Sequence, residues 1–157
     1  MPKLVIVRHG CAVPGQDNDA DRALTPQGVA EAEAAGQWLA TRFHGTATVL
    51  CSPYLRARQT AELISKAGTG PVEVDQNITP SGDPYAVVER LTSRQSDVVL
   101  VSHLPLVGRV ASLLTEGRLF DQPWSTAECW MLDGEVFAAG CMSVSQVWYP
   151  ALEQTGS

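Results

Sequence analysis

The sequence has few cysteines, and none of them form a pair with metal-binding or redox spacing. Its four cysteines contain no CxxC or CxxxC pair, which excludes a zinc knuckle and a redox dithiol: Cys11, Cys51, Cys129 and Cys141. No apolar run approaches the length of a membrane span, and the N-terminus has a strand pattern in place of a basic and apolar leader. We therefore expect a reduced, soluble protein of the cytoplasm.

Basic residues are also scarce. The chain has 11 Lys and Arg against 17 Asp and Glu, a net charge of −6, which argues against nucleic acid or an anionic membrane as a partner. The sequence shows no repeats, and 157 residues are enough for one domain but too few for two. We expect a single domain over residues 1–150 and a frayed polar tail over residues 151–157.

What the sequence does contain is an alternation of strands and helices. Apolar segments predict six strands, at 3–8, 47–51, 72–74, 97–102, 125–132 and 142–149. Four helices are predicted between them, with starts at Thr25-Pro26, Ser52-Pro53, Asp83-Pro84 and Pro105; the first of these is expected to end at Gly45. Short connections between these units favour an α/β fold, a largely parallel sheet with helices on both faces.

Arginines and histidines gather where the predicted strands end. Arg8 and His9 follow the first strand, Arg56 the second and His103 the fourth, while Arg22 lies between the first strand and the first helix. Ligands of such sheets bind beyond the carboxyl ends of the strands. Guanidinium groups and helix N-termini suit a dianionic phosphoryl group, and no carboxylate cluster suggests magnesium. Phosphoryl transfer without a metal needs a protein nucleophile, and imidazole is competent.

Five motifs occur in order along the chain: VRHG at 7–10, RALTPQG at 22–28, SPYLRARQT at 52–60, ITPSGDP at 78–84 and SHLPLVG at 102–108. With these motifs nearly the whole chain resembles the histidine phosphatase superfamily, and more closely the SixA-type phosphohistidine phosphatases. The resemblance implies a phosphoglycerate mutase-like fold, which has three α/β/α layers. Its six-stranded sheet is mostly parallel, with one antiparallel strand.

The resemblance also implies a role for each residue of the cluster. His9 would be the nucleophile, Arg8 and Arg56 would hold the phosphate oxygens, and His103 would contact them from the far side. Arg22 would complete the phosphate pocket, and water would hydrolyse phospho-His9 with no metal and no cofactor. Attack needs a free ring nitrogen, so we expect the other nitrogen of His9 to donate to a backbone carbonyl.

Two absences bear on the substrate. No carboxyl group takes the place of the acid that protonates an alkoxide in many superfamily members, because Asp83 precedes Pro84 and is better read as a helix cap. Residues 60–97 are too few to build a lid over the pocket. An open pocket without an acid favours phosphohistidine on a partner protein, such as a histidine phosphotransfer domain or a phosphocarrier. We expect the enzyme to act as a monomer.

Two other functions remain open at this point. The first is a small-molecule phosphomonoesterase that acts on a sugar or nucleotide phosphate. The second is a phosphohistidine-binding module without turnover. Cys11, directly after the RHG tripeptide and beside a positive cluster, is interpreted as a plain small side chain.

Overall fold

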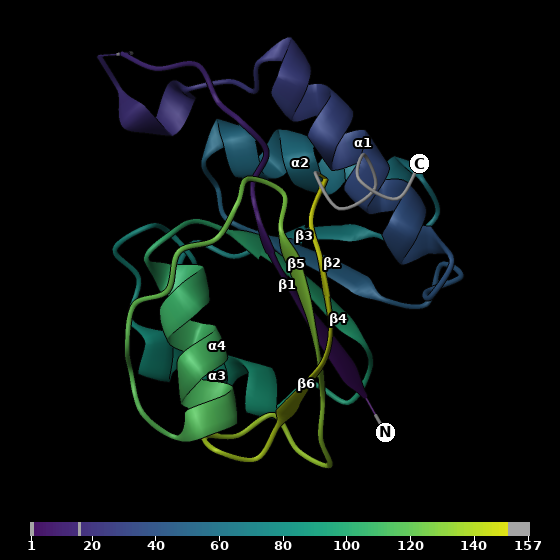
Figure 1. Ribbon diagram of the computed structural model, residues 1–157, viewed down its shortest axis with the longest axis vertical. Coiled ribbons are helices and arrows are strands. Elements are labelled where there is room, and N and C mark those ends of the chain that lie inside the picture. Colours follow the sequence, from purple (N-terminus) through teal and green to yellow (C-terminus); the bar gives the residue numbers. More distant parts are fainter. Residues whose placement is uncertain (1, 16, 151–157) are drawn as a thin grey trace.

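The structure is a computed structural model that describes residues 2–15 and 17–150, so the expected tail at 151–157 lies outside the described residues. At its centre is a six-stranded sheet with the order β3-β2-β4-β1-β5-β6 (Figure 1). The strands are β1 (Lys3–Arg8), β2 (Thr48–Cys51), β3 (Val72–Val74), β4 (Val98–Ser102), β5 (Cys129–Asp133) and β6 (Ser143–Trp148).

The pairing of the strands confirms the expected mixture of directions. The first four strands pair in parallel, β2 with β3, β2 with β4, and β1 with β4. β5 runs antiparallel to both of its neighbours, β1 and β6. Within the described part of the chain, β5 is therefore the single antiparallel strand of a mostly parallel sheet.

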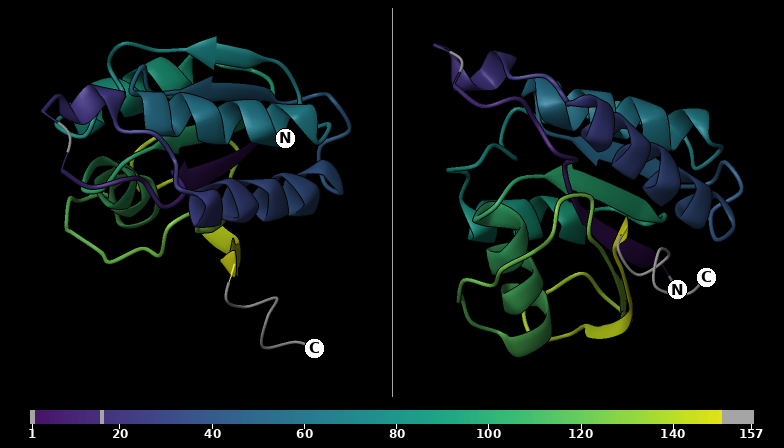
Figure 2. Two further views of the ribbon diagram at one scale, coloured as in Figure 1. Left: turned by 90° about the horizontal axis from the view of Figure 1, so that it is seen from above. Right: turned by 45° about the horizontal axis from the view of Figure 1, so that its top comes forward.

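Helices cover both faces of the sheet. α1 (Pro26–Ala40) and α2 (Leu55–Lys66) pack on one face, and α3 (Pro84–Thr92) and α4 (Leu106–Glu116) pack on the other (Figures 1 and 2). A short 3-10 turn, Asp19–Asp21, projects beyond the edge at which β1 ends. The fold therefore has the expected three layers, α/β/α.

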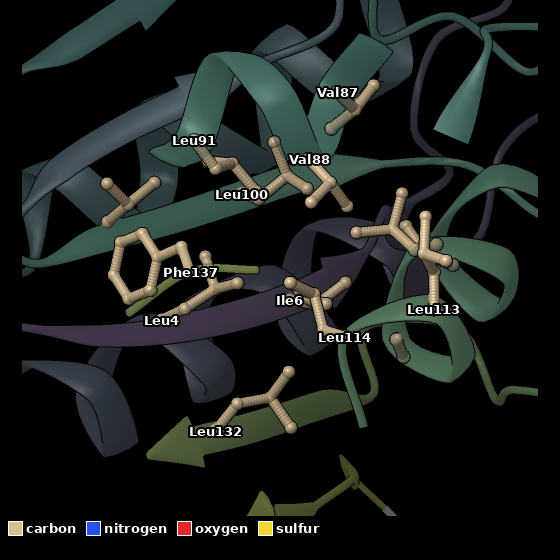
Figure 3. Close-up of a cluster of buried hydrophobic side chains, with 14 of the residues drawn as sticks. Leu4, Ile6, Val87, Val88, Leu91, Leu100, Leu113, Leu114, Leu132 and Phe137 are labelled. Atoms are coloured by element: carbon tan, nitrogen blue, oxygen red, sulfur yellow. The ribbon is translucent and has the colours of Figure 1, made fainter. Parts of the chain in front are cut away.

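The central strand β1 is buried from both sides. Leu4 and Ile6 face the α3 and α4 layer, where they meet Leu100 and Phe137 (Figure 3), and the alternate residues of β1 face α1 and α2. All four apolar residues of β1, residues 4–7, are fully buried. Burial of each such side chain stabilises the fold by roughly 1.5–3 kcal/mol, so the strand that ends in Arg8 is held firmly.

Two of the expected helix caps are present. The Thr25 side chain accepts a hydrogen bond from the Gly28 N–H at the start of α1, and the Asp83 side chain accepts one from the Tyr85 N–H at the start of α3. In both helices a proline occupies the first helical position, as expected, since its fixed φ suits a helix and it lacks the N–H that would be unpaired there. Asp83 is therefore a cap.

Two expected helix boundaries are wrong. α2 begins at Leu55 with Tyr54 as the N-cap residue, because the Ser52 N–H still bonds the Val101 carbonyl of the neighbouring strand. The first helix ends at Ala40, before the expected Gly45, because the chain turns over residues 41–42, where the Arg42 and Phe43 N–H groups both bond the Leu39 carbonyl. The first of these shifts keeps Ser52 at the edge of the sheet.

Two glycines let α1 approach the end of β1. A Cβ atom on Gly28 would lie 2.0 Å from the Cys11 carbonyl oxygen, and one on Gly10 would lie 2.6 Å from the Gly28 carbonyl oxygen. The Thr25 N–H donates to the same Cys11 oxygen at 2.9 Å. The segment after β1 is thus clamped directly against the N-terminus of α1.

Candidate active site

The candidate site lies at the edge of the sheet where the parallel strands end. Arg8 pairs with Ser102 at the ends of β1 and β4, so the residues that follow, His9 and His103, are neighbours. Their ring centroids are 5.1 Å apart. Arg56, the second residue of α2, reaches the same place from the end of β2.

His9 is held in the tautomer that nucleophilic attack requires. Its Nδ1 lies 2.6 Å from the Gly10 carbonyl oxygen, and because a carbonyl only accepts, Nδ1 carries the proton. This contact confirms the expected backbone partner. The Arg56 Nε–H donates to Nε2 of His9 at 3.3 Å. Burial, together with the Arg56 and Arg8 charges, lowers the pKa of His9 to about 4. Nε2 therefore keeps its lone pair at neutral pH.

His103 is also buried and neutral. Its Nε2 lies 2.7 Å from Oγ of Ser52, and that oxygen accepts a hydrogen bond from the Tyr54 N–H. The Ser52 hydroxyl donates to no other acceptor among the described residues; when it donates to Nε2 of His103, the ring proton lies on Nδ1. Burial, followed by the facing His9 and Arg56, lowers the pKa of His103 to about 2. Nδ1 has no partner among the described residues.

Arg8 is oriented through one end of its guanidinium. Its Nη1 donates to the Trp124 carbonyl at 2.6 Å, while its buried Nε has no partner within residues 2–15 and 17–150. Burial lowers the pKa of Arg8, and the nearby charges of Glu31 and Glu128 act in the opposite direction. A guanidinium stays protonated in proteins, so the Nε–H of Arg8 is a charged donor that lacks a partner among the described residues.

Arg22 joins the cluster through an acidic residue, Asp19. The Asp19 carboxylate accepts from Nη1 of Arg22 at 2.9 Å and from Nη2 of Arg56 at 3.1 Å. The Asp19 backbone carbonyl accepts from Nη1 of Arg56 at 2.7 Å. The hydrogen bonds from Arg22 and then Arg56 hold the pKa of Asp19 below its usual value. The structure therefore brings together all five residues expected from the sequence: Arg8, His9, Arg22, Arg56 and His103.

This arrangement suits an anion with several oxygens. Three guanidinium groups surround a neutral imidazole, and two buried nitrogens, Arg8 Nε and His103 Nδ1, have no hydrogen-bond partner in the part of the chain that the structure describes. Charged, preorganised donors of this kind bind phosphoryl oxygens strongly. Within the described ranges no three His, Cys, Asp or Glu side chains are grouped in a way that could hold a metal ion.

Sequence analysis missed three carboxylates of the site. Asp19 lies in the loop that precedes α1. Glu31 accepts hydrogen bonds from the Cys11 N–H and from the Thr126 hydroxyl, each at 2.9 Å. Glu128 accepts from the Ser125 N–H, and its carbonyl accepts from the Arg8 N–H. The contacts that tie each carboxylate to the site join distant segments, Asp19 to Arg56, Glu31 to Thr126 and Glu128 to Arg8, so no local pattern identifies them.

Known proteins are similar to this chain in sequence and in fold. Residues 4–79 match the family described as histidine phosphatase superfamily (branch 1). The phosphohistidine phosphatase SixA of Escherichia coli (strain K12) is 36% identical over 122 residues, which span 74% of this chain and 76% of that relative. The chain belongs to the histidine phosphatase superfamily. Its similarity to SixA within this superfamily makes the protein a hydrolase of the phosphatase class.

Further relatives place this histidine phosphatase in the SixA-like group. The SixA homolog of Haemophilus influenzae is 32% identical over 124 residues, which span 71% of this chain and 76% of that protein. The structure of the protein histidine phosphatase SixA complexed with tungstate matches 96% of this chain and 99% of its own, with a TM-score of 0.86 and 29% identity. A mycobacterial glucosyl-3-phosphoglycerate phosphatase, 18% identical with a TM-score of 0.70, shares the fold alone.

Proposed function

We propose that this protein is a metal-independent phosphatase that hydrolyses phosphohistidine on a partner protein, through a phosphohistidine intermediate on His9. The observation that carries the proposal is the state of His9, with Nδ1 anchored on the Gly10 carbonyl and Nε2 neutral beside Arg56. With a pKa of about 4, roughly one His9 in a thousand is protonated at pH 7. The names of the SixA relatives support phosphohistidine as the substrate.

In the first step, Nε2 of His9 attacks the phosphorus and the P–N bond to the partner's imidazole breaks. Arg8, Arg22 and Arg56 hold the phosphoryl oxygens, and Nδ1–H of His103 donates to one of them. In the second step a water molecule attacks phospho-His9, which releases inorganic phosphate and restores neutral His9. The three guanidinium charges and the Nδ1–H donor of His103 match the charge on the phosphoryl group, which supports a reaction without a metal.

The carboxyl groups around the site support a nitrogen leaving group. The Asp83 side chain is a helix cap bonded to the Tyr85 N–H at 3.0 Å, and the Asp19 carboxylate is bonded to two arginines. Glu31 accepts from the Cys11 N–H and the Thr126 hydroxyl, and Glu128 accepts from the Ser125 N–H and the Trp130 indole. None of these four carboxylates is placed as a free acid. The imidazole of a phosphohistidine is a good leaving group, and it departs as a neutral ring when its second nitrogen already carries a proton. The alkoxide leaving group of a phosphate ester, in contrast, would need an acid to protonate it.

The short segment between α2 and β4 leaves the site open, which supports a protein substrate, for example a histidine phosphotransfer domain or a phosphocarrier. Between α2 and β4 the chain forms only the three-residue strand β3 and the helix α3, so this segment contains no insertion that could cover the site. In the described ranges no helix is long and apolar enough to cross a membrane. The proposal includes residues 1–150 acting as one domain, as a monomer in the cytoplasm, without nucleic acid or membrane as a partner.

Turnover of a defined substrate tests the function. The wild-type protein with added EDTA should release phosphate from a histidine-phosphorylated phosphotransfer domain much faster than from p-nitrophenyl phosphate or a panel of sugar phosphates. His9→Ala should abolish release, while His44→Ala, which alters an exposed histidine outside the site, should not. Equal or faster release from the small esters would favour a phosphomonoesterase, and binding without release would favour a phosphohistidine-binding module.

A further inference from the structure

We propose that Asp19 is a positioning residue for the phosphate site, one that aims the Arg56 guanidinium at the phosphoryl group on His9. The assignment rests on the proposed function. It also extends the site beyond the arginines and histidines that follow the strands, because Asp19 comes from the 3-10 turn before α1. Asp19 acts through Arg56 and Arg22.

The two edges of the Arg56 guanidinium have different partners, Asp19 on one and His9 on the other. The edge formed by Nη1 and Nη2 is taken by Asp19, through the backbone carbonyl at 2.7 Å and the carboxylate at 3.1 Å. The Nε–H faces Nε2 of His9 at 3.3 Å. A guanidinium is rigid and planar, so fixing one edge sets the direction of the other. The edge formed by Nε and Nη2 is thereby left facing the reacting nitrogen.

The same carboxylate brings in the second arginine. Oδ1 of Asp19 accepts from Nη1 of Arg22 at 2.9 Å, and Nε of Arg22 donates to the Val13 carbonyl at 2.6 Å. Arg22 and Arg56 carry like charges and come from separate segments, so an anion between them offsets their repulsion when no phosphate is bound. Asp19 therefore holds Arg22 and Arg56 together in the enzyme without bound phosphate.

The turn that carries Asp19 is held by hydrogen bonds of its own. The Asn18 side chain accepts from the Ala20 N–H at 3.1 Å, and the Asn18 carbonyl accepts from the Asp21 N–H at 3.0 Å. These bonds form within residues 18–21, so they do not depend on the Asp19 carboxylate. Replacing that carboxylate should therefore leave the turn intact. About half of the Asp19 side chain is exposed, so the replacement should also have little effect on folding.

Asp19→Asn removes the charge and keeps the backbone carbonyl, and Asp21→Asn is a matched control in the same turn, because the Asp21 side chain is exposed. We expect Asp19→Asn to lower kcat roughly 10- to 100-fold on the phosphohistidine protein, with a smaller change in KM. Inhibition by orthovanadate, a mimic of the five-coordinate phosphorus, should weaken more than inhibition by orthophosphate. Asp21→Asn should stay within about twofold of wild type, since surface substitutions of this kind have small effects.

Three results would overturn the assignment. Asp19→Asn could match Asp21→Asn in kcat and in vanadate inhibition. It could bind phosphate more tightly at unchanged kcat, which would make Asp19 a competitor of the substrate. It could lower Tm and weaken both inhibitors by the same factor, which would make Asp19 part of the scaffold.

The test separates this assignment from the proposed function. If wild type fails to release phosphate from the phosphohistidine protein, the proposed function fails. In that case the role of Asp19 is tested without turnover. The measured quantity is the rise in Tm that orthovanadate and orthophosphate each produce in wild type and in Asp19→Asn. If Asp19→Asn loses the rise in Tm with orthovanadate but keeps the rise with orthophosphate, Asp19 positions Arg56. If both rises fall by the same factor, Asp19 does not.

Discussion

Acid should destabilise this protein before its carboxylates protonate, because its two buried histidines, His9 and His103, stay neutral in the folded state. The pKa of His9 is lowered to about 4 and that of His103 to about 2, in both cases first by burial, whereas an unfolded histidine titrates at 6.5. Below pH 6.5 the unfolded chain therefore binds more protons than the folded one. The free energy of unfolding then falls as pH falls, by up to about 1.4 kcal/mol per pH unit for each histidine.

The size of the effect follows from these values. At pH 5 an unfolded histidine is almost fully protonated, while folded His9 and His103 remain neutral. Each histidine then reduces the free energy of unfolding by about 2 kcal/mol relative to pH 8, or about 4 kcal/mol for the pair. Small domains have a total stability of about 5–15 kcal/mol, so this loss should be easy to measure.

Urea unfolding in phosphate-free buffer at pH 8, 7, 6 and 5 measures the loss directly. His103→Asn replaces the ring with a group that does not titrate, so it should remove about half of the dependence on pH between 6.5 and 5. His9→Asn should do the same, and provides the test if His103→Asn does not fold. His44→Ala, at an exposed position, is the matched control. A stability that stays flat from pH 8 to pH 5, or an unchanged slope in both Asn variants, would refute the reasoning.

Two further substitutions test the local geometry. Gly28→Ala places a Cβ 2.0 Å from the Cys11 carbonyl oxygen, so it should destabilise the fold by about 1–3 kcal/mol in urea unfolding, and should lower kcat by shifting the segment after His9. A more stable variant, as helix propensity alone would give, would count against the close packing. Ser52→Ala leaves Nε2 of His103 buried without its 2.7 Å partner. It should cost about 1–3 kcal/mol and shift the His103 ¹⁵N signals, and unchanged signals would exclude Ser52 as the residue that sets the tautomer.

Much of the fold and part of the site could be predicted, because both are encoded locally. The strands are short apolar runs, and α1 and α3 begin with a capping side chain followed by a proline. His9, Arg56 and His103 could be found because each follows a strand of a parallel sheet, and such strands end at one edge. The prediction that one strand is antiparallel came from the resemblance to a known family, as did the role of Arg22, and the structure shows that this strand is β5.

The parts that could not be predicted depend on contacts between distant segments. Asp19 meets Arg56 across 37 positions, and Glu31 meets Thr126 across 95. In the sequence these carboxylates look like ordinary polar residues of a loop and of a helix surface. The late start of α2 has a similar cause, since the bond from the Ser52 N–H to the Val101 carbonyl of β4 keeps Ser52 at the edge of the sheet despite the proline that follows.

The measurement that tests the central claim most directly is capture of the phosphoenzyme. Wild-type protein is mixed with an excess of a histidine-phosphorylated phosphotransfer domain, quenched in alkali within the first turnover, and mapped by peptide mass analysis. We predict a phosphoryl group on His9 that is stable in alkali and labile in acid, present in wild type and His44→Ala and absent from His9→Ala. Release of phosphate with no phosphoenzyme, or a phosphoryl group on another residue, would contradict the account.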